Sequence, residues 1–130
     1  MKLKGGKLML GEIENGERMN FKNKMATLLC LDGLVYIIND DFLQKCADDI
    51  DKLPPQKARV RASALFGGAH CARVGRKNKI YVKDAPEAAS LFGEEFGASV
   101  ISDDICVIFP SGKSESDIVF FADYVKKENG

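Results

Sequence analysis

The stretch Ala26–Ile38, with the sequence ATLLCLDGLVYII, decides the fold that we predict for this chain. Two apolar runs of strand length flank Asp32-Gly33, and such a dipeptide between such runs is the strongest short-range indication of a β-hairpin. The segment Ala98–Phe109 has the same form, with two apolar runs around Asp103-Asp104. The sequence therefore predicts one hairpin in each half of the chain.

Further strands and helices are predicted from turn residues and apolar periodicity. Strands are expected at Lys7–Ile13, Glu17–Lys22, Ala69–Val74 and Lys79–Lys83. Helices are expected from Phe42 to Leu53 with Asp40 or Asp41 as the cap, at Gln56–Phe66, at Asp84–Gly93 with Asp84 as the cap, and from about Ser116 with Ile118, Phe121, Ala122 and Val125 on the apolar face.

These elements form an internal repeat. Adding 61 to the numbers 8–22 gives 69–83, whereas adding 71 maps the first hairpin onto the second; the difference of ten equals the length of Asp84–Gly93. The first half is thus expected to be the same unit without its short helix. A unit of about 55 residues buries little surface alone, so we expect two intertwined copies that share one core.

The predicted fold class is therefore α+β, with two pseudo-repeated swapped-hairpin-type β units forming a small barrel-like core with flanking helices. The expected division is a first half at 1–53, a connecting helix at 54–68 and a second half at 69–130, all in one compact unit.

Charge is segregated along the chain although the net charge is zero. Residues 56–83 hold eight Lys or Arg and no acidic residue, whereas residues 84–130 hold ten acidic residues and three lysines. Such segregation can create a local positive field on a neutral protein. It is equally compatible with a solvated basic surface that has no partner.

Several function classes lack support in the sequence. No apolar run approaches the roughly 20 residues of a membrane span, and no signal peptide is evident, so a cytoplasmic location is expected. The four cysteines, Cys30, Cys46, Cys71 and Cys106, lack metal-ligand spacing and are predicted to be buried reduced thiols. His70 and Cys71 are adjacent and would point to opposite faces of a strand. We predict no enzymatic activity, no metal and no cofactor.

The order of elements, given twice, resembles the MraZ family and the wider AbrB/SpoVT swapped-hairpin group. Members of that family carry a motif of the form D-x-x-G-R-hydrophobic-x-hydrophobic-P at a turn and the strand after it. The corresponding segments here are Glu14–Lys22 (ENGERMNFK) and Gly75–Lys83 (GRKNKIYVK). The motif arginine is Arg18 in the first copy and Lys79 in the second, while the closing proline is lysine in both.

The resemblance implies a transcriptional regulator, associated with the nucleoid, that assembles into a ring-like homo-oligomer and binds double-stranded DNA. By position, Arg18 and Lys79 would contact bases or phosphates. Arg76 and Lys77 are added as DNA-binding candidates because of their charge and their place in a turn. Arginine can bind guanine with two hydrogen bonds, whereas lysine suits phosphate better.

Simpler interpretations exist for each candidate residue. Arg18 can form a surface salt bridge with a neighbouring Glu, and Arg76 and Lys77 can simply make a turn soluble. Tyr81 and Phe21 are more often core or cross-strand residues than platforms for bases. The alternative function is an assembly or protein-interaction module on the same fold, without DNA binding.

Overall fold

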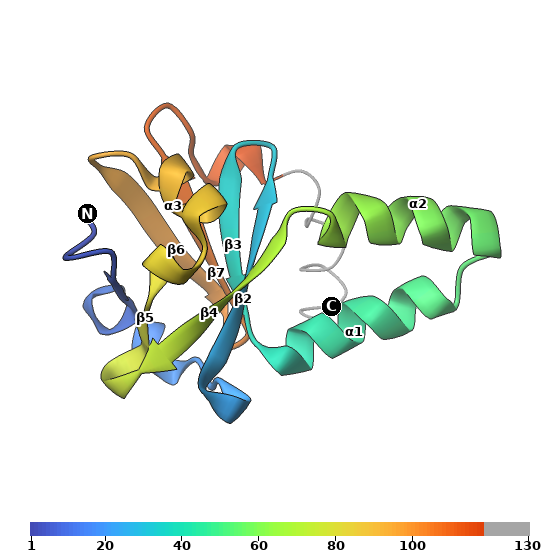
Figure 1. Cartoon of the computed structure of the whole chain (residues 1–130), viewed down its shortest axis with the longest axis horizontal. Coiled ribbons are helices and arrows are strands. Elements are labelled where there is room, and N and C mark those ends of the chain that lie inside the picture. Colours follow the sequence, from blue (N-terminus) through green and yellow to red (C-terminus); the bar gives the residue numbers. More distant parts are fainter. Residues whose placement is uncertain (119–130) are drawn as a thin grey trace.

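The computed structural model describes residues 1–118 as a mixed α+β fold (Figure 1). A curled, antiparallel half-barrel sheet has the strand order β1-β5-β4-β2-β3-β7-β6. The strands are β1 (Leu8–Met9), β2 (Met25–Leu31), β3 (Leu34–Ile38), β4 (Ala69–Gly75), β5 (Lys79–Ile80), β6 (Phe96–Ser102) and β7 (Ile105–Pro110). The α-helices of the described part are α1 (Asp40–Asp51), α2 (Pro55–Phe66) and α3 (Pro86–Phe92).

Both predicted hairpins are confirmed. The β2–β3 hairpin closes with Leu31 opposite Leu34, and its turn residues Asp32 and Gly33 have φ values of 52° and 78°. The β6–β7 hairpin closes with Ser102 opposite Ile105 and contains an irregularity between Val100 and Ser102. Positive φ at both residues between the first pair of strands is typical of a tight hairpin turn, which explains why the local sequence was sufficient.

Strand β3 is buried on both faces, and this explains its uninterrupted apolar sequence. Val35 and Ile37 contribute to a core inside the curl of the sheet, which α3 closes with Ala88 and Phe92. The other residues of β3, including Tyr36, face a second core shared with α1 and α2. Side chains alternate between faces along a strand, so one segment of five residues supplies both cores.

The order of the sheet interleaves segments that are distant in the chain. Strand β1 is separated from β2 and β3 by β5 and β4, and β2 pairs with β4 through partners such as Met25 and Arg73. Strands β3 and β7 pair near the other end of the order, where Tyr36 lies opposite Val107. Neither half of the chain therefore forms a sheet of its own.

Helices α1 and α2 form a helical hairpin that projects away from the sheet (Figure 1). Phe42, Cys46 and Ile50 are buried on the inner face of α1, as the helical spacing predicts. The predicted cap is wrong, because Asn39 caps α1 by accepting a hydrogen bond from the Phe42 amide at 3.0 Å. The Asn39 side chain also donates to the Asn20 carbonyl oxygen and the Asp104 carboxylate, which locks the helix start to two loops.

The N-terminal segment departs most from the prediction. The strand expected at Lys7–Ile13 is only Leu8–Met9, and Glu17–Lys22 contains no strand. Met19 and Phe21 are nonetheless buried while Asn20 between them is exposed. The alternation thus reflects burial of an extended segment that lacks a partner in the sheet. In the same way β5 covers only the first two residues of the strand expected at Lys79–Lys83.

The remaining helices also show one correction. The helix expected at Gln56–Phe66 is confirmed as α2, and the short helix before Gly93 is confirmed as α3. The predicted cap Asp84 is wrong, since Ala85 occupies that position without a side-chain hydrogen bond. Of the expected last helix, the described part contains a 3-10 turn at Glu115–Asp117, and Phe121, Ala122 and Val125 lie outside the described residues.

The four cysteines lie in different environments. Cys46 and Cys106 are buried and Cys30 is half-buried, whereas Cys71 is exposed, against the expectation of a buried thiol. It lies on the side of β4 opposite the buried Ala72. No helix within residues 1–118 is long and apolar enough to cross a membrane.

Candidate functional site

The two turns that the sequence singled out lie in direct contact. The first is the 3-10 turn Gly16–Arg18 and the second is the 3-10 turn Arg76–Asn78, and we call them the paired turns. The side-chain amide of Asn78 donates to the Gly16 carbonyl oxygen at 3.2 Å and to the Met19 carbonyl oxygen at 2.7 Å. One side chain therefore joins turns that are about 60 residues apart in the chain.

Local sequence explains the shape of each turn. Asn15, Lys77 and Asn78 have positive φ values of 66°, 55° and 54°, a backbone region that asparagine tolerates better than most residues. Gly16 packs directly on the carbonyl of Leu10, where a Cβ atom would lie 1.8 Å from the oxygen. Only glycine fits there, so the first turn requires its Asn-Gly pair.

The four predicted site residues lie on or beside the paired turns. Arg18 ends the first turn and its side chain is 64% exposed, and Arg76 and Lys77 are exposed in the second. Lys79 is half-buried in β5, opposite Met9 of β1 and Gly75 of β4. The structure thus brings together the backbone segments that carry all four residues.

Arg18 forms an ion pair with an aspartate, rather than with the neighbouring Glu that the sequence suggested. Its Nη2 atom lies 3.4 Å from Oδ1 of Asp103 in the β6–β7 turn, and both side chains are more than 60% exposed. A pair with so much solvent contact contributes little to stability and can exchange for another anion.

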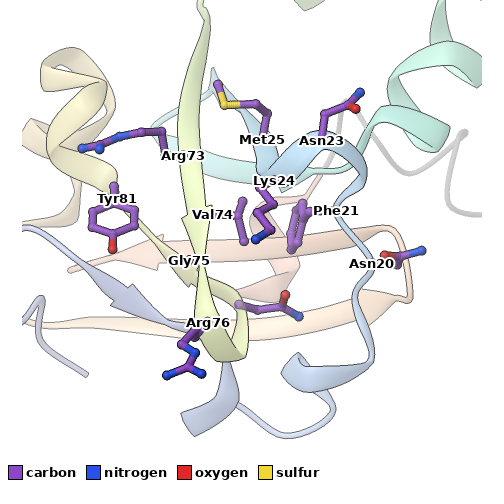
Figure 2. A pocket seen from close by; sticks show the side chains of 11 residues that line it. Asn20, Phe21, Asn23, Lys24, Met25, Arg73, Val74, Gly75, Arg76 and Tyr81 are labelled. Carbon is purple, nitrogen blue, oxygen red and sulfur yellow. The ribbon is translucent and has the colours of Figure 1, made fainter.

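A pocket of about 690 Å³ adjoins the paired turns, and we call it the β4 pocket (Figure 2). Phe21 and Val74 form an apolar part, whereas Lys24, Arg73 and Arg76 supply positive charge. Asn20, Asn23, Met25, Gly75, Asn78 and Tyr81 complete the lining. None of these lining residues is acidic, so the β4 pocket is suited to an anion with an apolar part.

Arg73 is held in place at the edge of the β4 pocket. Its Nε and Nη2 atoms donate to the two carboxylate oxygens of Asp84 at 2.9 and 3.2 Å, and its backbone amide donates to the same carboxylate at 3.1 Å. These hydrogen bonds lower the pKa of Asp84 and raise that of Arg73. The guanidinium also lies over the Tyr81 ring, 4.7 Å from its centroid.

The acid-free stretch 56–83 does not form one surface. Its first three cations, Lys57, Arg59 and Arg61, belong to α2, which projects to the right in Figure 1, whereas β4 and β5 lie toward the lower left. Arg76 and Lys77 belong to the second of the paired turns, and Lys79 follows them in β5. The acid-free stretch therefore supplies positive charge at separate places.

Sequence reasoning did not select Lys24, Arg73, Asn78 or Tyr81 as site residues. Arg73 could have been selected from the sequence because it belongs to the acid-free stretch. Lys24 could not have been selected in this way, because it reaches the β4 pocket only through the pairing of β2 with β4, where Met25 lies opposite Arg73.

No protein-family model, curated protein or solved structure matches this chain. The function must therefore be argued from the residues themselves. Within residues 1–118, no group of three or more His, Cys, Asp or Glu side chains could hold a metal ion.

Proposed function

We propose that the chain is a DNA-binding regulator that contacts double-stranded DNA through the paired turns, in an arrangement that resembles MraZ proteins. The observation that carries this proposal is the contact made by Asn78, which places the turns of Arg18 and Arg76 side by side. Positive side chains on adjacent, exposed turns can follow the phosphates of a duplex, and an arginine between them can reach base edges in the major groove.

The register of the sheet supports the family resemblance. Tyr36 and Val107 are partners at the β3–β7 pairing and differ by 71 in number, which is the repeat offset. Val35 pairs with Ile108, and the residues that correspond to them in the other half, by the same offset of 71, are Cys106 and Ile37. These two residues also pair with each other. The same offset maps the end of one hairpin onto the end of the other. These are the pairs expected if a pseudo-twofold axis between β3 and β7 relates the two hairpins.

A single copy offers few contacts, so the proposal includes a homo-oligomer that presents several pairs of turns to one duplex. The α1–α2 hairpin is suited to such assembly because its two helices have opposite charge. Helix α1 carries five Asp and one Lys, whereas α2 carries Lys57, Arg59 and Arg61 and no acidic residue. Val60 on α2 is 70% exposed, which adds an apolar contact. Side-by-side copies could therefore match α1 of one with α2 of the next in a ring.

The proposal is tested by fluorescence anisotropy with duplex DNA at 50 and 200 mM salt. If the four basic residues of a copy each neutralise one phosphate, affinity falls roughly 100-fold over this interval for each copy bound to the duplex. Arg18→Ala and Arg76→Ala should each weaken binding and reduce the salt slope, the slope of log affinity against log salt concentration, by about 0.9 in magnitude per bound copy. Lys113→Ala, which changes an exposed lysine after β7, is the matched control and should leave the slope nearly unchanged.

The alternative function, an assembly module without DNA binding, has one observation in its favour, the ion pair that engages Arg18 with Asp103. It predicts an oligomer by solution mass and no binding to DNA even at 50 mM salt. That combination of results would replace the DNA-binding proposal, whereas a steep salt dependence that requires Arg18 and Arg76 would exclude the alternative.

A further inference from the structure

Three cationic side chains from three separate segments converge on the Tyr81 ring. Lys7 lies immediately before β1, Arg73 lies in β4, and Lys83 follows β5. Their charged groups lie 5.5, 4.7 and 5.9 Å from the ring centroid, respectively. The electron-rich face of an aromatic ring attracts cations at such distances, which helps to hold the three groups together.

The cluster carries excess positive charge. Asp84 neutralises Arg73, but within residues 1–118 no ion pair joins Lys7 or Lys83 to a carboxylate. The attraction of Lys7 and Lys83 to the single Tyr81 ring offsets little of the repulsion among the neighbouring cations. An anion at this place would therefore be bound favourably. The paired turns contain none of these residues, and Lys83 stands where the family motif has its closing proline, so none of the three cations matches a residue of that motif.

Part of the Arg73 guanidinium is open to a second anion. Asp84 occupies the edge formed by Nε and Nη2, which fixes the plane of the guanidinium and leaves the Nη1 side for another acceptor. Gly75 allows the Tyr81 ring to lie against β4, since a Cβ atom there would be 3.1 Å from a ring carbon. Arg73 and the ring are thus held rigidly, and the two lysines are flexible donors that can close on a phosphate.

We propose that Lys7, Arg73 and Lys83 around Tyr81 form a phosphate-binding site distinct from the paired turns. A phosphate can come from the DNA backbone or from a small phosphorylated compound. The first source rests on the proposed function. Arg73 is three residues before Arg76 of the second turn, so the phosphate site adjoins the proposed DNA contacts. Arg73 and Tyr81 also line the β4 pocket, and Figure 2 shows them on one side of β4 with Phe21 and Lys24 on the other.

The test uses the full chain and the double variant Lys7→Gln/Lys83→Gln, in which glutamine keeps the first two methylenes of the lysine side chain and removes the charge. The matched control is Lys52→Gln/Lys113→Gln, which removes two exposed lysines elsewhere. Far-UV circular dichroism verifies that both variants fold. In one arm, duplex DNA is titrated at several salt concentrations. In the other, inorganic phosphate is titrated while amide and side-chain NMR signals of Lys7, Arg73 and Lys83 are followed.

The Lys7/Lys83 variant loses two phosphate contacts in each copy, so its salt slope should be smaller in magnitude than that of the control by about 1.8 per bound copy. Its preference among DNA sequences should be the same. Phosphate should shift the NMR signals of the cluster in the parent chain and not in this variant. Phosphate-induced shifts without any DNA binding would identify a small compound as the source and refute only the proposed function. An unchanged salt slope together with no phosphate-induced shifts would overturn the phosphate site while leaving DNA binding by the turns intact.

Discussion

Gly16→Ala is the substitution that the structure predicts most sharply. The new Cβ atom would lie 1.8 Å from the Leu10 carbonyl oxygen and 2.7 Å from its carbon, compared with about 3.4 Å for ordinary contact. The obstacle is backbone, so relief requires the turn to move away from Leu10. That movement strains the hydrogen bond from the Gly16 amide to the Ile13 carbonyl oxygen and the one from Asn78 to the Gly16 carbonyl oxygen.

The expected cost is about 3 kcal/mol, at the upper end of what overpacking and strained backbone cause. In urea unfolding with an m-value of about 2 kcal/mol/M, this corresponds to a midpoint lowered by roughly 1.5 M. Circular dichroism measures the transition. Gly97→Ala is the matched control, because the nearest atom to its added Cβ is at 3.8 Å, and it should change the free energy of unfolding by less than about 1 kcal/mol.

A refuting result would be a Gly16→Ala protein whose unfolding midpoint and slope match those of the parent chain. Such a result would mean that Gly16 does not pack on the Leu10 carbonyl, and it would contradict the arrangement that brings the paired turns into contact. The prediction therefore tests the arrangement of the site without requiring any DNA.

Three further predictions concern residues with distinct surroundings. Asn39→Ala removes the α1 cap and two hydrogen bonds of a side chain that is 2% exposed, so unfolding in urea should show a loss of about 2–3 kcal/mol. Because Arg73 holds the pKa of Asp84 below 3.8, this pair stabilises the fold above that pH and the stabilisation is lost as the pH falls below it. Carboxyl NMR should show the Asp84 pKa rising in Arg73→Gln, and an unchanged value would contradict the ion pair. Burial raises the pKa of Cys106 to about 12, so a thiol reagent should modify the exposed Cys71 quickly and Cys106 only on unfolding, and equal rates would exclude the assigned burial.

Local chemistry was sufficient where an element depends on neighbours in the chain. The Asp32-Gly33 turn, the spacing of Phe42, Cys46 and Ile50, and the glycine after α3 are each properties of a few consecutive residues. Alternation at Met19 and Phe21 also indicated burial correctly. It could not establish a strand, because a strand requires a hydrogen-bonded partner, and this segment has none in the sheet.

The amino-acid sequence by itself determined the two hairpins, the helices of the described part and the residues of the turns, since backbone preferences and apolar periods act over short distances. Only the tertiary structure decided that Asn78 binds the first turn, that Asp84 serves Arg73 rather than a helix, and that the cations of α2 lie apart from those of β4. The physical reason is that pairing of distant strands depends on how the whole chain buries its apolar faces. The charged residues of the candidate site can thus be identified from the sequence, but their positions relative to one another depend on the pairing of the strands.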